Sequence, residues 1–306
     1  METTSHTNAA AAGGATPPVP PPDHPATTGD KLQQFMAKMS RMFVIREQLP
    51  VWLRWSLGII PVVVLLLIWS LLTMGDTAEE RMFSPTILPS PGEVIASFHE
   101  VWFDKTLLRN VFVSFSRIAG GFGLAFLIAF PLGVLMGAFT KIKAMFNPLS
   151  VFSAYLPIPA LVPLTLSLFG TGETQKIAFL ATAFVIYLLP LIVQAVDNVD
   201  EIYLKTAYTL GATKRQTVVH VLLSVAWQEI YQALRMGFGI GWSYIILAEI
   251  VDMQKGLGGI ISVAQRRARP DHVYFVLLVI VVIAFLTDKL WGWGGKMLFP
   301  YAGEKR

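Results

Sequence analysis

Few residues of this chain have the types and spacing that chemistry requires. The sequence contains no cysteine, which excludes thiolate nucleophiles, thiolate metal ligands and disulfides. Within its apolar stretches there is neither a serine–histidine pair nor a carboxylate dyad of the kind that hydrolases use. The histidines lie outside these stretches and are not clustered at metal-ligand spacing; they are His6, His24, His99, His220 and His272. The sequence therefore predicts neither a membrane hydrolase nor a metalloenzyme.

A site for ATP hydrolysis is not expected either. The stretch "GWGGK", Gly292 to Lys296, lacks the spacing of the phosphate-binding pattern Gly-x-x-x-x-Gly-Lys-Ser/Thr and its terminal hydroxyl. We therefore expect neither enzymatic activity nor a cofactor in this chain.

The composition is that of a polytopic membrane protein. Of 306 residues, 54% are hydrophobic and 14% are charged, whereas soluble proteins are about a quarter charged. The net charge of +4 comes from basic residues that flank apolar runs, a pattern that orients helices in a membrane and does not indicate nucleic-acid binding. The fold class predicted is all-α and membrane-spanning.

The N-terminal part has two regions. Residues 1–30 are rich in Pro, Ala, Thr and Gly and predict a disordered tail. A cleaved signal peptide is not expected, because the basic region followed by a short apolar core is missing. Residues 31–50 place Leu32, Phe35 and Met39 on one helical face and basic residues on the other. This pattern favours an amphipathic helix on the membrane surface over a merely solvated helix.

The transmembrane domain, 51–306, contains six apolar stretches. The length of each is judged against the ~20 residues that one membrane crossing needs. The stretches lie near 52–74, 112–138, 148–169, 177–196, 227–250 and 273–293. Prolines interrupt the third and the fourth, most densely at Pro157, Pro159 and Pro163. A broken helix at membrane depth needs protein or water beside it, so the third stretch is a candidate wall of a translocation path.

The distribution of lysine and arginine predicts the orientation. With the N-terminus inside, the outer loops contain Arg81, Lys105, Arg109, Lys176, Lys255, Arg266, Arg267 and Arg269. The inner segments contain the larger set, which is Lys31, Lys38, Arg41, Arg46, Arg54, Lys141, Lys143, Lys205, Lys214, Arg215, Lys296, Lys305 and Arg306. Both termini and the loop 199–224 are therefore expected on the cytoplasmic side.

Small residues recur at every fourth position in two spans, which favours close helix packing. They are Gly121, Ala125, Ala129, Gly133 and Gly137 in the second span and Ala233, Gly237 and Gly241 in the fifth.

Several charged residues lie near the ends of the spans. Glu249 either closes an outer gate by pairing with a cation such as Arg266 or Arg267 or is a solvated helix-end acid. For Arg117 and Arg235 we favour side chains that snorkel to the membrane surface. The basic outer loop with Arg266, Arg267 and Arg269 either attracts anions or an acidic binding protein, or is simply solvated.

The loop 199–224 predicts a helical hairpin. A first helix ends at Gly211, which supplies a left-handed terminal residue, and Thr213 caps a second helix that runs to the membrane. Ile202, Ala207 and Leu210 are expected to pack inward. A partner could then contact Lys205, Tyr208, Lys214, Arg215 and Gln216.

The hairpin resembles the cytoplasmic loop of binding-protein-dependent ABC importer permeases. Ala207, Gly211 and Leu223 match that pattern, while Lys205 stands where Glu is expected and Ser224 replaces Pro. Other stretches are similar to the nitrate/sulfonate/taurine/bicarbonate type of permease. They are "LPSPGEV", "SFSRIAGGF", "PLGVLMG", "LFGTGETQK", "TLGATKRQT" and "AEIVDMQKGLGGII", in the right order between about residues 84 and 296.

The resemblance implies a type I ABC importer permease in the bacterial inner membrane, with a cytoplasmic coupling helix. Its implied partners are two ATPase subunits that bind ATP and Mg, an extracytoplasmic substrate-binding protein, a second permease copy and membrane lipid. The coupling residues implied are Tyr203, Lys205, Thr206, Ala207, Tyr208, Leu210, Gly211, Ala212, Thr213, Lys214 and Arg215. Lys205 then indicates either an acidic ATPase groove or a solvated position that tolerates either charge.

Polar or helix-breaking residues within the spans are candidates for the translocation path. They are Tyr155, Pro157, Pro159, Gln194, Trp242, Ser243 and Glu249. The function expected is import of a small anion or sulfonate-like solute by alternating access. The rival is a secondary transporter or channel without an ATPase, in which the loop 203–224 is dispensable. A structural scaffold would leave the broken spans without a use.

Overall fold

The structure, a computed structural model, describes residues 49–75, 80–251 and 255–300. The predicted tail, 1–30, and nearly all of the predicted surface helix, 31–50, lie outside the described residues. The chain forms two compact units, Met1–Val62 and Val63–Arg306. The contacts, cavities and sites described below lie in the second unit.

The predicted membrane spans are confirmed. Among the described residues, five helices are long and apolar enough to cross a membrane. Four are α2 (Val51–Leu72), α4 (Leu107–Ala138), α7 (Glu173–Asp197) and α12 (Pro270–Leu298), and the fifth, Lys214–Ile250, comprises α9 (Lys214–Gln216), the π-type turn η4 (Thr217–Leu222) and α10 (Leu223–Ile250).

The stretch predicted as the third span, near 148–169, forms a bent pair of helices and not one straight helix. The pair consists of α5 (Thr140–Ala154) and a second piece made of the short turn η3 (Ile158–Ala160) and α6 (Leu161–Phe169), which meet at 91°. The break follows from Pro157 and Pro159, because each proline removes a backbone donor and Pro157 is extended, with ψ 109°.

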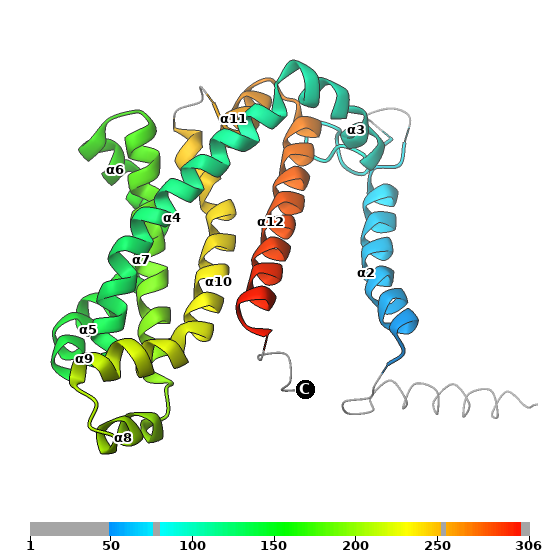
Figure 1. Cartoon of the computed structure of the whole chain (residues 1–306). Helices are drawn as coiled ribbons and strands as arrows, with labels where there is room; N and C mark the ends of the chain where they lie inside the picture. The colour runs from blue at the N-terminus through cyan, green and yellow to red at the C-terminus, as the bar shows by residue number, and fades with distance from the viewer. Residues whose placement is uncertain (1–48, 76–79, 252–254, 301–306) are drawn as a thin grey trace, which may run out of the picture. The chain divides into compact units, whose positions relative to one another are not determined.

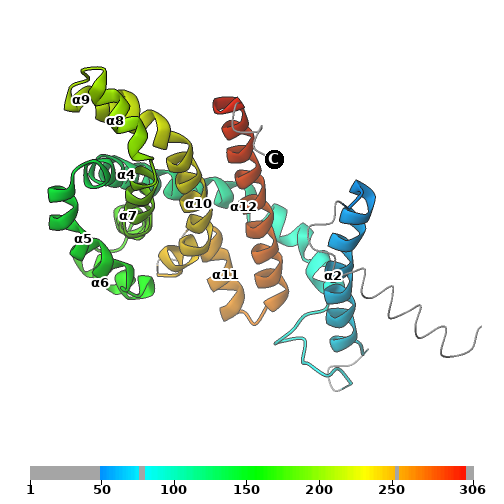
Figure 2. The same ribbon diagram turned by 90° about the horizontal axis from the view of Figure 1, so that it is seen from below.

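Helix α7 forms the centre of the second unit and packs against α4 and α10. The small-residue stripes allow this close approach. A Cβ atom at Gly121 would lie 2.6 Å from Leu180 Cβ, and one at Gly241 would lie 2.6 Å from Phe184 Cζ. Figure 2 shows α4, α7, α10 and α12 side by side, with α5 and α6 beside α7.

Short helices mark the two ends of this bundle (Figure 1). At one end, called the α11 end here, lie α3 (Pro91–Ala96) and α11 (Leu257–Arg266). Ser90 and Glu93 start α3 with a complete capping box. At the other end, called the hairpin end, α8 (Glu201–Thr209) and α9 project from the bundle.

Candidate functional site: a projecting hairpin and a polar groove

The predicted hairpin at 199–224 is confirmed. The Asp200 carboxylate accepts a hydrogen bond of 2.9 Å from the Ile202 N–H and so caps α8. The chain reverses at Gly211, whose φ of +81° favours glycine. Thr213 and Gln216 form a capping box that starts the second helix, as the sequence predicts.

The tip of the hairpin is more apolar than expected. Ala207 is buried as predicted, but the prediction that Ile202 and Leu210 pack inward is wrong, because their exposed fractions are 62% and 82%. The reason is that α8 packs against η4 on one face only and projects from the bundle. With Tyr203 and Tyr208, which are also exposed, they form an apolar surface suited to a partner protein.

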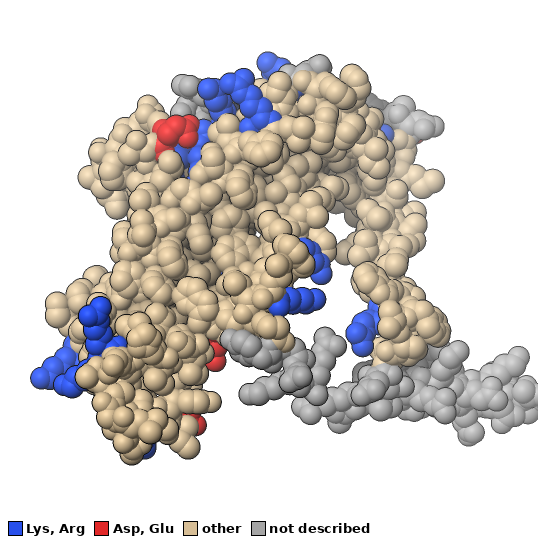
Figure 3. Space-filling model, in the orientation of Figure 1, with Lys and Arg blue, Asp and Glu red and all other residues tan. Residues whose placement is uncertain are grey.

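Lys205 has a local partner on this surface. Its Nζ lies 2.8 Å from Glu201 Oε2 one turn earlier on α8. This hydrogen bond raises the pKa of Lys205 and lowers the pKa of Glu201. Lysine and arginine side chains gather at both the hairpin end and the α11 end, whereas the middle of the bundle is mostly uncharged (Figure 3).

The hairpin is mechanically connected to the opposite end of the bundle. Helix α9, η4 and α10 follow one another without a break from Lys214 to Ile250. The π-type turn at Thr217–Leu222 is a local irregularity of the kind often found at functional positions.

Three cavities follow the hairpin half of α7. The first, about 300 Å³, lies between α7 and α10 and is lined by Gln194, Asn198 and Glu229 among others. The second, about 420 Å³, lies between α5 and α7 and shares Gln194 and Asn198. The third, about 220 Å³, lies at the broken span and includes Tyr187 and Tyr244.

The structure brings together some of the path candidates. Tyr155 and Gln194 line the second cavity, and Pro157 and Pro159 lie at the break that separates α5 from α6. Ser243 is exposed on α10. Trp242 is buried, and its indole donates a 3.1 Å hydrogen bond to Thr287 Oγ1 of α12.

Glu249 lies in a buried ionic network at the α11 end. Its Oε1 accepts from Arg117 Nη1 at 2.6 Å and from Ser114 Oγ at 2.7 Å, and its Oε2 accepts from the Gly258 N–H at 2.8 Å. Both Arg117 and Glu249 are at most 1% exposed. The carboxylate thus satisfies the N-terminus of α11 and a buried cation at once.

The network extends to α7. Arg117 also binds Glu173 through two hydrogen bonds of 2.6 and 2.5 Å and donates to the Lys255 carbonyl at 2.9 Å. The Leu257 N–H donates to Ser114 Oγ at 3.0 Å. Arg117 therefore ties α4 to α7, α10 and the segment before α11.

Two interpretations of charged residues are corrected. Arg117 does not snorkel, because its guanidinium is satisfied inside the bundle. Glu249 is not a solvated acid, and its cation is Arg117 and not Arg266 or Arg267, which are exposed. Arg235 pairs with Asp288 of α12 through two hydrogen bonds of 2.6 Å. Carboxylates on neighbouring helices offer these arginines a closer partner than the membrane surface.

The basic loop after α11 is partly neutralised. Arg269 Nη2 lies 2.8 Å from Asp271 Oδ2 and 3.1 Å from Glu100 Oε2, on the π-type turn η2 (Glu100–Asp104). Arg266 and Arg267 stay exposed. In the part of the chain that the structure describes, no group of three or more His, Asp or Glu side chains is arranged to hold a metal ion.

The residues Ser114, Glu173, Asn198, Gln228, Glu229 and Gln232 were missed from the sequence. Three of these residues could have been found, because Gln228, Glu229 and Gln232 lie close together near the start of an apolar span. Polar residues at such a place indicate that protein or water lies beside them. Ser114 and Glu173 gave no such signal, because their partners are more than 50 residues away.

The chain is similar to known transport proteins. Residues 129–292 match the family described as "binding-protein-dependent transport system inner membrane component". The taurine transport system permease protein TauC of Escherichia coli strain K12 is 30% identical over 256 residues, which cover 81% of this chain and 90% of the relative. The nitrate import permease protein NrtB of a Synechocystis strain is 25% identical, over 75% of this chain and 84% of the relative.

The fold has a solved counterpart. A chain in the inward-facing structures of the MetNI methionine ABC transporter superposes with a TM-score of 0.56. The superposition covers 62% of this chain and 95% of that chain, at 20% sequence identity. This similarity supports the type I importer permease architecture predicted from the sequence.

Proposed function

Because the chain belongs to the binding-protein-dependent transport system inner membrane components, we propose that it is the membrane-spanning subunit of an ATP-driven importer for a small anion or sulfonate-like solute. Relatives named for taurine, aliphatic sulfonates, nitrate and bicarbonate transport support this range of solutes.

The observation that carries the coupling role is the hairpin at 199–224. Its exposed apolar tip, with Ile202, Tyr208 and Leu210, suits a groove on a partner ATPase. Its second helix is continuous with α10. Closure of two ATPases would bring two hairpins together, and α10 would transmit that movement through the bundle.

The remaining parts of the proposal follow from this role. ATP and Mg are bound by the ATPase partners, and this chain supplies gating and coupling. A second copy of the permease completes the path, and an extracytoplasmic protein delivers the solute. The hairpin and both termini lie on the cytoplasmic side, in agreement with the excess of lysine and arginine in the inner segments.

The path itself follows the three cavities along α7. Tyr155, Pro157, Pro159 and Gln194 line or shape them. Trp242 and Glu249 act from inside the protein: Trp242 holds α10 to α12, and Glu249 holds the start of α11.

The test is gentle extraction of the tagged chain from its native membrane, followed by mass spectrometry of stable partners. We expect a P-loop ATPase at about one copy per permease copy, and we expect deletion of 203–216 to abolish the association. The matched variant Glu229→Gln, outside the hairpin, should retain it. Recovery of the chain without an ATPase, where a control transporter keeps its own, would instead support a transporter or channel that works alone.

A further inference from the structure

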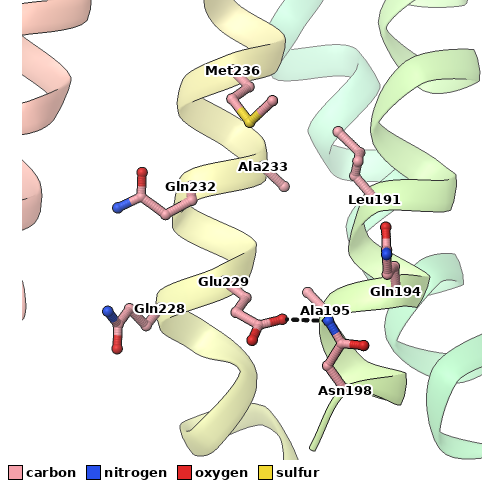
Figure 4. A pocket seen from close by; sticks show the side chains of 9 residues that line it. All are labelled: Leu191, Gln194, Ala195, Asn198, Gln228, Glu229, Gln232, Ala233 and Met236. Carbon is pink, nitrogen blue, oxygen red and sulfur yellow. Dashed lines mark hydrogen bonds between the residues drawn. The ribbon is translucent and has the colours of Figure 1, made fainter. Parts of the chain in front are cut away.

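The groove between α7 and α10 presents a mixture of polar groups at its surface. Figure 4 shows Asn198 and Glu229 facing each other across the groove, with Gln194 one turn above Asn198. The Asn198 amide donates a 3.0 Å hydrogen bond to Glu229 Oε2. Ala195 and Ala233 leave room between the two helices, and Met236 lies farther along α10.

These polar groups face away from the packed core. Gln194, Asn198, Glu229 and Gln232 are all exposed, and the side chains of Gln194 and Gln232 form no hydrogen bond within the described ranges. Amides and carboxylates are costly against hydrocarbon without partners. This face of α7 and α10 therefore requires water, a polar ligand or a polar surface of the second permease copy beside it.

The groove combines amide hydrogen-bond donors with one carboxylate. Amide N–H groups donate hydrogen bonds to oxyanions. The Glu229 carboxylate accepts hydrogen bonds and attracts a cation, and the groove contains no lysine or arginine to neutralise it. A volume of about 300 Å³ is at the small end for ligand sites.

We infer that this groove binds a small zwitterion, a solute with an oxyanion such as sulfonate at one end and an ammonium group at the other. Gln194 and Asn198 donate to the oxyanion, and Glu229 receives the ammonium. The inference rests on the proposed import function and narrows its solute class. A simple anion without an ammonium group is repelled by Glu229.

The absence of cysteine allows a direct test with single cysteines in the full transporter. Met236→Cys places a thiol at the end of the groove, about 10 Å along α10 from Glu229. Inside-out membrane vesicles are treated with a cationic and an anionic methanethiosulfonate reagent. We expect the thiol to react, and the cationic reagent to be favoured by about fourfold, as one charge at that distance in water predicts.

Two variants control this measurement. Glu229→Gln keeps the shape of the side chain and should remove the preference for the cationic reagent. Val281→Cys lies in the apolar middle of α12 and is 67% exposed, so it should react slowly with both reagents. If Met236→Cys is as unreactive as Val281→Cys, or if the preference survives in Glu229→Gln, the inference is wrong.

Protection of the Met236→Cys thiol by added solutes then tests whether the groove binds a zwitterion. Taurine, which has both groups, should slow the labelling of Met236→Cys, and ethanesulfonate, which lacks the ammonium, should not. Equal effects of the two compounds, or no effect of taurine, would overturn the assignment. Copurification of the ATPase is measured in the same vesicles, so that loss of the ATPase refutes the importer, while a retained ATPase without taurine protection refutes only the site.

Discussion

The two ends of the bundle use charged residues in opposite ways. At the α11 end, Arg117 and Glu249 are at most 1% exposed and hydrogen-bonded to each other. In the groove near the hairpin end, Glu229 is exposed, and its one hydrogen bond within the described residues is with Asn198. Both carboxylates belong to the same helix, α10, twenty residues apart.

This difference indicates that the two ends of α10 have different roles. A buried and fully bonded carboxylate fixes the surrounding backbone, because each of its partners loses a hydrogen bond if it moves. An exposed carboxylate with free acceptor capacity can exchange partners. The α11 end is therefore the fixed part of the bundle, and under the proposed function the groove and hairpin meet ligands and partners.

The largest effect is expected from Glu249→Ala. Removal of this carboxylate leaves Arg117 with a buried positive charge that Glu173 alone must compensate, and it leaves the Gly258 N–H without its acceptor. Breaking a buried ion pair costs about 3–5 kcal/mol. Thermal unfolding of the purified chain in detergent should show this loss as a lower midpoint.

The matched control is Glu229→Ala on the same helix. Its carboxylate is exposed, so the free energy of unfolding should change by less than about 1 kcal/mol. Equal midpoints for the two variants would contradict the division between the ends. The double variant Arg117→Met with Glu249→Leu should recover part of the lost stability, since it removes both buried charges.

The second largest effect is expected at the hairpin from Leu210→Asp. Leu210 is 82% exposed, so the fold should be unaffected. If the hairpin docks through its apolar tip, as proposed, a charge at Leu210 should weaken ATPase binding by about 30-fold, as the loss of about 2 kcal/mol at a docking contact implies. The readout is the ATPase affinity in detergent. Unchanged affinity would mean that the tip does not dock.

Much of this architecture could be predicted from the sequence, because its signals are local. Apolar stretches predicted the membrane-spanning helices, and Pro157 and Pro159 predicted the break between α5 and α6. Gly211 and Thr213 predicted the hairpin. Each signal depends on neighbours within a few residues. The stripes of small residues also predicted close packing correctly, although not that both stripes face α7.

The ionic network could not be predicted, because it joins residues far apart in the chain. Arg117 and Glu249 are separated by 132 residues, and nothing local distinguishes a buried Arg117 from one that reaches to the membrane surface. The burial of Ile202 and Leu210 was predicted wrongly because a local pattern was present but misleading. Their spacing suggests a buried face, but the hairpin projects, and both side chains are exposed among the described residues.

A smaller loss of stability is expected from Gly121→Ala. This residue lies in the contact of α4 with α7, which positions Arg117 opposite Glu173. In Gly121→Ala the new Cβ would lie 2.6 Å from Leu180 Cβ and 3.2 Å from the Ala181 nitrogen. Overpacking of this kind costs about 1–3 kcal/mol. At Gly123, on the same helix, a Cβ meets nothing within 4 Å, so Gly123→Ala should unfold at the same temperature as the parent or slightly higher. A lower midpoint for both would show that helix packing is not the cause.

The smallest effect on stability is expected from Lys205→Glu, which replaces the exposed ion pair with Glu201 by two like charges. Fully exposed pairs of this kind contribute little to stability because water screens them, so the midpoint of unfolding should barely change. The affinity for the ATPase then separates the two interpretations of Lys205. A large decrease that is relieved at high salt indicates an acidic groove on the ATPase, because salt screens such attraction. An unchanged affinity, beside a large loss in Leu210→Asp, indicates that the hairpin docks through its apolar tip and that Lys205 faces water.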